Sequence, residues 1–80
     1  MTIKEKTLAL AAEHNIELFV KDVILISLPE GWELSDGTTG WGGEWDHNLS
    51  NYQCWKLIYA DVLDLVERKS EWREIVKVGA

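Results

Sequence analysis

The sequence predicts a small α+β domain in which an antiparallel sheet of two to three strands packs against one long amphipathic helix, with shorter helices at the N- and C-termini. Three observations support this fold class. A helix-capping signal opens the chain, β-branched runs follow it, and a long stretch with helical apolar spacing begins near position 50. Eighty residues fit a single globular domain, residues 1–80, with no sign of a linker.

The first helix is expected at about residues 3–14. Thr2 and Glu5 have the spacing of a capping box, in which the hydroxyl and the carboxylate each satisfy an exposed backbone N–H group. Asn15 tolerates the left-handed conformation in which helices often end. Local signals therefore mark both ends of this helix.

Two strands are expected next, at residues 16–20 and 23–28, because both segments are dense in β-branched residues. Lys21 and Asp22 between them form a weak hairpin turn, since neither residue adopts positive φ as easily as Gly or Asn. One long bent strand, or a longer first helix followed by one strand, are the alternatives.

A turn and a glycine-rich loop are expected in the middle of the chain. In Pro29-Glu30-Gly31, the proline presets φ and the glycine accepts positive φ, which predicts a hairpin between residues 26–28 and 32–34. Residues 35–48 contain four of the six glycines and no apolar periodicity. This segment is therefore predicted to be a loop.

The long helix is expected at about residues 51–69. Ser50 and Gln53 form a second capping box, and Leu49 can pack against Cys54 one turn into the helix. Its apolar face is Trp55, Ile58, Tyr59, Val62, Leu65 and Val66.

The end of the chain allows two interpretations. Ser70 suits the N-cap of a last short helix that turns Trp72, Ile75 and Val76 inward. A terminal strand at residues 76–78 is the alternative.

Negative charge is concentrated in the middle of the chain. Eight Lys and Arg against fourteen Asp and Glu give a formal net charge of −6 and a pI near 4.7. Residues 1–15 and 54–80 are each neutral, so residues 16–53 carry the whole excess. This charge repels nucleic-acid phosphates and anionic membranes, and it would attract a basic protein. Solubility alone is the other interpretation.

Cysteine usage and hydropathy indicate a cytoplasmic protein. One cysteine cannot form an intramolecular disulfide, and one Cys with two His cannot complete a common structural zinc site. The longest apolar run, residues 23–26, is far too short to span a bilayer, and no targeting signal is visible. We expect no cofactor, no bound metal and no membrane partner.

The segment from Gly37 to His47 is the candidate binding region. Glycines permit close backbone approach, and tryptophans offer large rigid contact surfaces with a hydrogen-bond donor. Trp41 and Trp45 either turn inward to enlarge a small core or contact a ligand or partner. The candidate binding residues are Trp32, Glu33, Asp36, Trp41, Glu44, Trp45, Asp46 and His47.

Catalytic chemistry fits the sequence less well. The glycines lack the spacing of a familiar phosphate loop, and the carboxylates between positions 36 and 46 do not follow the EF-hand pattern. His47 with Cys54 suggests a base and a nucleophile, but packing against Leu49 would bury the thiol as a small hydrophobe. We therefore expect a protein that is not an enzyme.

The leading hypothesis is a non-enzymatic acidic binding protein that docks on a basic protein surface, with Trp41 and Trp45 as anchors. By analogy of size and charge, its role would be that of an inhibitor or accessory protein, as in immunity proteins and the inhibitors of phages and mobile elements, which present carboxylates to basic grooves. The steering carboxylates would be Glu30, Glu33, Asp36, Glu44 and Asp46.

The alternative hypothesis is a protein that binds or sequesters a small molecule. Its site would be a Trp-lined pocket under the glycine-rich loop, in one version completed by the second subunit of a homodimer.

Overall fold

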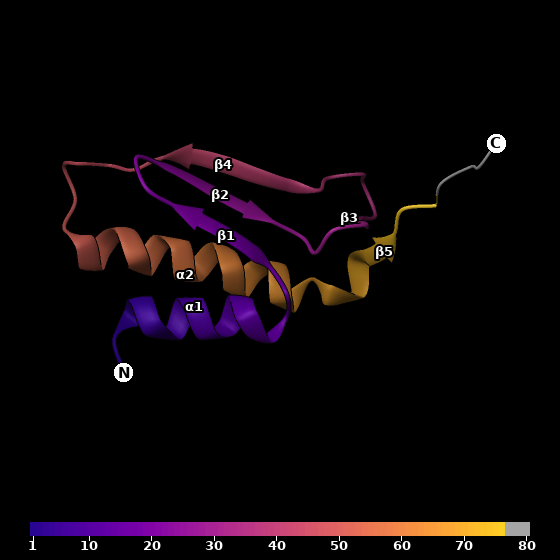
Figure 1. The fold of residues 1–80 in the computed structure, drawn as a ribbon, viewed down its shortest axis with the longest axis horizontal. Coiled ribbons are helices and arrows are strands. Elements are labelled where there is room, and N and C mark those ends of the chain that lie inside the picture. Colours follow the sequence, from indigo (N-terminus) through magenta and orange to yellow (C-terminus); the bar gives the residue numbers. More distant parts are fainter. Residues whose placement is uncertain (77–80) are drawn as a thin grey trace.

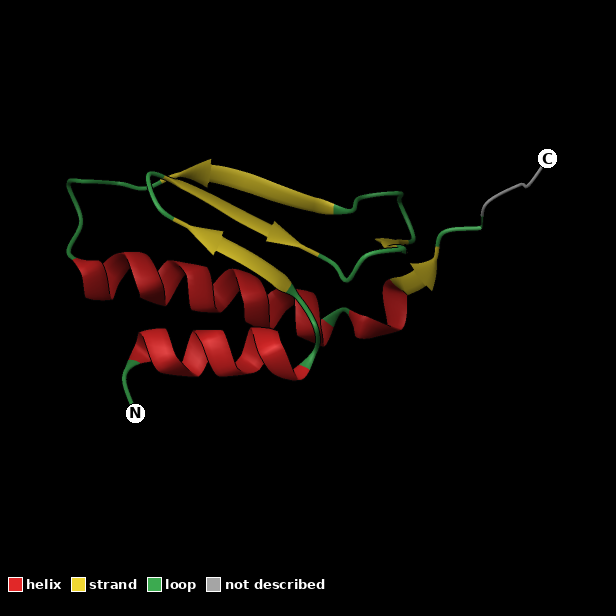
Figure 2. Ribbon diagram, in the orientation of Figure 1, coloured by secondary structure: helices red, strands yellow, loops and turns green. Residues whose placement is uncertain are grey.

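The computed structural model describes residues 1–76 and places two helices against one face of a three-stranded sheet (Figure 1). The elements in chain order are α1 (Ile3–Glu13), β1 (Glu17–Val20), β2 (Val23–Ser27), β3 (Trp32–Leu34), β4 (Gly40–Glu44), α2 (Asn51–Glu67), the 3-10 turn η1 (Lys69–Glu71) and β5 (Trp72–Glu74). The main sheet has the antiparallel order β1-β2-β4, and β3 pairs with β5 in a separate two-stranded sheet (Figure 2). The α+β class, the short first helix and the 17-residue main helix are confirmed.

Both helices begin at the predicted capping boxes. The Glu5 backbone N–H donates to Thr2 Oγ1 at 3.1 Å, and the Gln53 backbone N–H donates to Ser50 Oγ at 3.1 Å. Asn15 follows α1 with a φ of 56°, the left-handed conformation expected there. These predictions succeed because each signal acts within one turn of the chain.

Residues 17–27 form a hairpin. The expectation of two strands is therefore confirmed, and the single bent strand and the longer first helix are not observed. Glu17 pairs with Ser27 and Val20 with Ile24, and the Lys21 backbone N–H donates to the Val23 carbonyl at 2.9 Å. The chain therefore reverses over residues 21–23, although the composition of this turn is unfavourable.

The predicted hairpin between residues 26–28 and 32–34 is wrong. Its turn is present, because the Trp32 backbone N–H donates to the Pro29 carbonyl at 3.0 Å and Gly31 has a φ of 87°. After this turn, however, the chain leaves the main sheet, and β3 pairs with β5. The edge of β2 that β3 was expected to occupy is taken by β4.

The segment predicted as a loop, residues 35–48, contains that third strand, β4. In its register with β2, Ile26 pairs with Trp41 and Ile24 pairs with Gly43. A Cβ added at Gly40 would lie 2.5 Å from the Ile26 carbonyl oxygen, so the close approach of these strands requires glycine there. Glycine is depleted in strands generally, which hides β4 from a prediction based on propensity.

The predicted short C-terminal helix is also wrong. Lys69–Glu71 make one 3-10 turn, and Trp72–Glu74 form β5 against β3. The Trp72 indole N–H donates to the Leu65 carbonyl at 3.1 Å, which holds the start of β5 against the end of α2. The alternative strand at residues 76–78 lies outside the described residues except for Val76, which is not in a strand.

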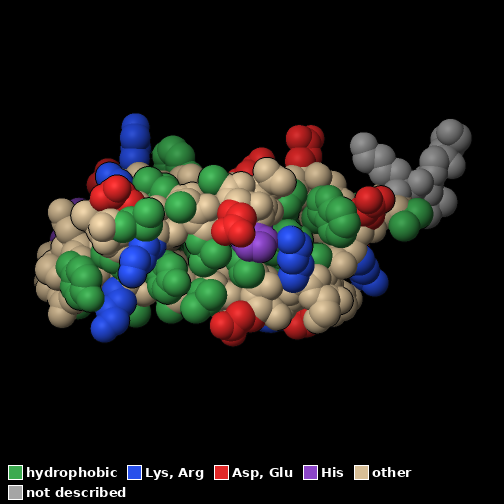
Figure 3. Space-filling model, turned by 90° about the horizontal axis from the view of Figure 1, so that it is seen from below, with side chains coloured by type: hydrophobic (Ala, Val, Ile, Leu, Met, Phe, Trp, Pro, Cys, Tyr) green, Lys and Arg blue, Asp and Glu red, His purple; other side chains and the backbone are tan. Residues whose placement is uncertain are grey.

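The core lies between the main sheet and the helices. Burial alternates along β1 and β2, so that one face packs inward while Phe19, Val23 and Leu25 remain 44–49% exposed on the other. The buried cluster is Ala11, Ile16, Ile26, Leu28, Leu34, Trp55, Ile58, Val62 and Leu65. On the helix side, hydrophobic, acidic and basic side chains are intermingled (Figure 3). Within residues 1–76, every helix is too short or too polar to cross a bilayer.

Candidate functional site

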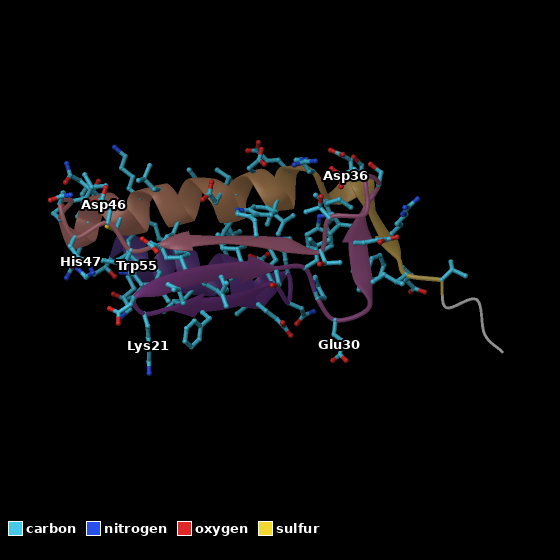
Figure 4. All side chains as sticks on the ribbon, turned by 90° about the horizontal axis from the view of Figure 1, so that it is seen from above. Lys21, Glu30, Asp36, Asp46, His47 and Trp55 are labelled. Atoms are coloured by element: carbon cyan, nitrogen blue, oxygen red, sulfur yellow. The ribbon has the colours of Figure 1, made fainter. Side chains whose placement is uncertain are left out.

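The predicted site residues are distributed between two ends of the molecule. Asp46 and His47 lie at one end, beside Trp55, whereas Asp36 and Glu30 lie at the opposite end (Figure 4). Trp32 and Glu33 belong to β3, at the same end as Asp36 (Figure 1). The carboxylates of residues 16–53 therefore do not gather on one acidic surface.

The carboxylates near β3 take part in internal contacts. Glu33 Oε1 accepts a hydrogen bond from Arg73 Nε at 3.0 Å, which links β3 to β5. Asp36 Oδ1 accepts a hydrogen bond from the Thr38 backbone N–H at 2.9 Å, and this bond lowers the pKa of Asp36. These two side chains support local structure, so they are less available to a partner.

Trp41 and Trp45 are half-buried and pack against the core. Trp41 lies opposite Ile26 on the inner face of the sheet. Trp45 meets Trp55 edge to face, with ring centroids 6.3 Å apart and planes at 68°. Both tryptophans thus add to the core, and Trp41 also borders a groove.

This groove, the β4–α2 groove, has a volume of about 210 Å³. It runs beneath the glycine-rich segment, between β4 and the first half of α2. Its lining is mostly apolar: Ile24, Ile26, Trp41, Gly42, Gly43, Leu49, Cys54, Leu57 and Ile58, with the acidic residues Glu44, Asp46 and Asp61. The Glu44 side chain alternates to the outer face of the sheet, so it borders the groove rather than pointing into it.

The groove is open because position 43 has no side chain. Gly43 pairs with Ile24, whose side chain packs against the core, so a side chain at either position belongs to the inner face. A Cβ added at Gly43 would meet nothing within 4 Å, and Gly43 is not among the glycines with positive φ. Neither packing nor backbone conformation requires glycine at position 43. The main effect of this glycine is that it leaves the groove open.

The charged lining residues of the groove are all acidic. Burial raises the pKa of Asp61, and the neighbouring Asp64 raises it further. Asp46 Oδ1 accepts a hydrogen bond from the Asn48 backbone N–H at 2.9 Å, and its carbonyl lies 3.4 Å from Cys54 Sγ. Within residues 1–76 these carboxylates form no salt bridge. An apolar floor beside such carboxylates suits a ligand that combines an apolar group with a positive charge.

Cys54 and His47 line different hollows. Cys54 is buried and contributes to the β4–α2 groove. His47 borders a separate, shallow hollow together with Lys21 and Asn51. Among residues 1–76, no three His, Cys, Asp or Glu side chains form a group that could hold a metal ion.

Several groove residues were missed by the sequence-based prediction, chiefly Ile24, Leu57 and Asp61. Leu57 carried a usable signal, because it is a large apolar residue outside the core-facing stripe of α2, and it is 58% exposed. Asp61 follows it by four residues, on the same side of the helix.

Comparison with protein-family models, with curated proteins and with solved structures finds no match to this chain.

Proposed function

We propose that the protein is a non-enzymatic binding protein that docks on a basic segment of another protein through the β4–α2 groove. The observation that supports this most directly is an apolar groove whose charged lining residues are all carboxylates. Burial of an apolar side chain in the groove would supply affinity, and the carboxylates would favour a positively charged partner and speed its association. An inhibitory or accessory role is consistent with this mode of binding.

An exposed apolar side chain on α2 extends the proposed contact surface. Leu57 lines the groove and is 58% exposed. Large apolar side chains near a groove are typical of protein interaction sites. The net charge of −6 acts at longer range and makes association with a basic partner sensitive to salt.

The test compares two double variants that change net charge equally. Glu44→Gln with Asp61→Asn alters two acidic residues that border the groove, whereas Glu13→Gln with Glu67→Gln alters exposed carboxylates elsewhere. A protein captured from the native host at low salt would be purified, and its affinity for each variant measured by calorimetry. We expect the groove variant to weaken binding about tenfold or more, and the control variant to change it much less.

Equal weakening by the two double variants would show that only net charge matters and would contradict docking at the groove. Affinity that is insensitive to salt would contradict the electrostatic part of the proposal.

A second candidate function is small-molecule binding in the same groove, which the unfilled space over Gly43 favours. Its volume of about 210 Å³ falls below the roughly 300–1,000 Å³ of typical ligand pockets. The groove would therefore accept a small apolar amine or one part of a larger ligand. A rise in melting temperature with such amines, together with failure to capture any protein, would favour this candidate.

A further inference from the structure

The outer edge of β4 is the feature that extends the proposed function. Two backbone hydrogen bonds bracket the β2–β4 ladder: Leu28 N–H donates to the Thr39 carbonyl and Trp45 N–H donates to the Asp22 carbonyl, both at 2.9 Å. Hydrogen-bonded and non-hydrogen-bonded pairs alternate along an antiparallel ladder. The bracketing bonds therefore determine which residues of β4 bond to β2.

By this alternation, the backbone groups of Trp41 and Gly43 bond to β2. The N–H and C=O groups of Gly40, Gly42 and Glu44 are directed to the opposite edge. Within residues 1–76, none of the backbone hydrogen bonds outside the helices and strands involves these three residues. β4 thus presents a row of donors and acceptors at an open sheet edge, directly beside the β4–α2 groove.

An extended chain added to this edge would have a defined side-chain pattern. Side chains alternate between the two faces of a sheet, and Trp41 and Gly43 face the helices while Glu44 faces outward. One set of side chains from the added strand would enter the groove, where the space over Gly43 is empty. The other set would lie on the outer face, beside the Glu44 carboxylate. Alternating apolar and basic residues match these two environments.

We propose, building on the proposed function, that the partner segment binds as an extended strand hydrogen-bonded to β4, with an apolar side chain in the groove over Gly43 and flanking Lys or Arg side chains on the outer face near Glu44. Backbone bonds to the edge would supply much of the affinity, and the groove would supply selectivity for the side chain. Charge decides between this occupant and a second copy of the chain. A second copy on the same edge would bring together the acidic groups of two chains that each carry −6.

The experiment uses the full chain and two synthetic heptapeptides of identical composition. One alternates lysine and valine, and the other has four lysines followed by three valines. Calorimetry gives their affinities, and amide hydrogen exchange followed by NMR reports the backbone N–H groups of Gly42 and Glu44. We expect the alternating peptide to bind about tenfold tighter and to slow exchange at both amides.

Two variants test the subsite over Gly43. Gly43→Leu fills the groove without a backbone clash, so the chain should fold and bind the alternating peptide about tenfold more weakly. Ala9→Leu adds a similar side chain at an exposed position of α1 and should leave affinity unchanged. Circular dichroism confirms that both variants are folded.

Each other outcome overturns the strand-addition proposal. Equal binding of both peptides, lost in the variant carrying Glu44→Gln and Asp61→Asn, would leave docking on basic segments in place and exclude the added strand. If neither peptide bound, strand addition at β4 would be excluded. The proposed function would then be tested separately, by the affinity of the captured protein for the groove and control variants. Slow exchange at Gly42 without peptide, with a dimer seen by sedimentation, would identify a second copy as the occupant.

Discussion

Gly42 and Gly43 are neighbours in β4 that face opposite sides of the sheet. A Cβ added at Gly42 would lie 2.7 Å from Leu25 Cδ2 and 2.9 Å from the Ile24 carbonyl oxygen. At Gly43 the same atom would meet nothing within 4 Å. Strand packing therefore requires the first glycine, while the second keeps the groove open.

Alanine substitutions separate these two roles. We expect Gly42→Ala to lower the free energy of unfolding by about 1–3 kcal/mol, because a neighbouring backbone carbonyl must shift. Gly43→Ala should change it by less than about 1 kcal/mol. Urea unfolding followed by tryptophan fluorescence measures both. Similar losses in the two variants would show that the space over Gly43 is not open in solution.

Asp61 gives a pH-dependent prediction at the same scale. Its pKa is raised above the ordinary 3.8 by burial and then by Asp64, so the folded chain binds this proton more readily than the unfolded chain. The ionised carboxylate therefore lowers stability well above the folded-state pKa, and this penalty is lost as the pH falls through it. Solvent screening keeps the effect small.

We expect Asp61→Asn to melt at a higher temperature than the unsubstituted protein at pH 7, with the difference narrowing as the pH approaches about 4. Melting temperatures measured across this range test the sign. Glu13→Gln makes the same change in net charge and corrects for the general effect of charge. If the difference in melting temperature widened as the pH fell, the pKa of Asp61 would be lowered in the folded chain rather than raised.

At the scale of elements, the start of α2 positions one wall of the groove. The Ser50 hydroxyl accepts a hydrogen bond from the Gln53 backbone N–H at 3.1 Å. Ser50→Ala should lower the free energy of unfolding by roughly 0.5–2 kcal/mol, because this N–H loses its partner. Ser70→Ala is the matched control, since η1 has no side-chain cap. Chemical denaturation of both variants makes the comparison, and equal losses would argue against a capping role for Ser50.

α1 and α2 were predictable because their signals are local, whereas the first hairpin was one of three alternatives and the C-terminal helix was predicted wrongly. Capping boxes act over three residues, and the apolar face of α2 repeats along one element. The pairing of β3 with β5 joins Glu33 to Arg73, which are 40 residues apart, and no local pattern reports such a contact. β4 was not predicted for another reason. Its glycines are needed because β2 and β4 approach closely, and this close approach exists only in the assembled sheet.

The candidate site was predictable only in part, for the same reason. Trp41, Glu44 and Asp46 were selected from the sequence, and all three border the groove. Leu57 and Asp61 lie on α2, and their proximity to β4 depends on how the helix packs beside the sheet. Residue types in the glycine-rich segment identified the wall of the groove that β4 forms. The opposite wall, on α2, depends on tertiary packing.

At the scale of the whole molecule, the two faces of the main sheet have different environments. α1 and α2 cover one face, whereas Phe19, Val23 and Leu25 on the other face remain 44–49% exposed. An antiparallel sheet commonly has one face in water, although that face is usually polar. Of the acidic residues, Asp46 lies at one end of the molecule and Glu30 and Asp36 lie at the other (Figure 4). Under the proposed function, the net charge would attract a basic partner at long range and the groove would determine where it binds.

The pairing of β3 with β5 also sets an order of events during synthesis. The β1–β2 hairpin has all its residues once Ser27 has been made. The partners in β3 and β5 are separated by about 40 residues, as Glu33 and Arg73 are. At about 5–20 residues per second, β3 therefore waits roughly 2–8 s for its partner strand. The small sheet closes after both β4 and α2 have been translated, which makes it a late step in the assembly of a nascent chain.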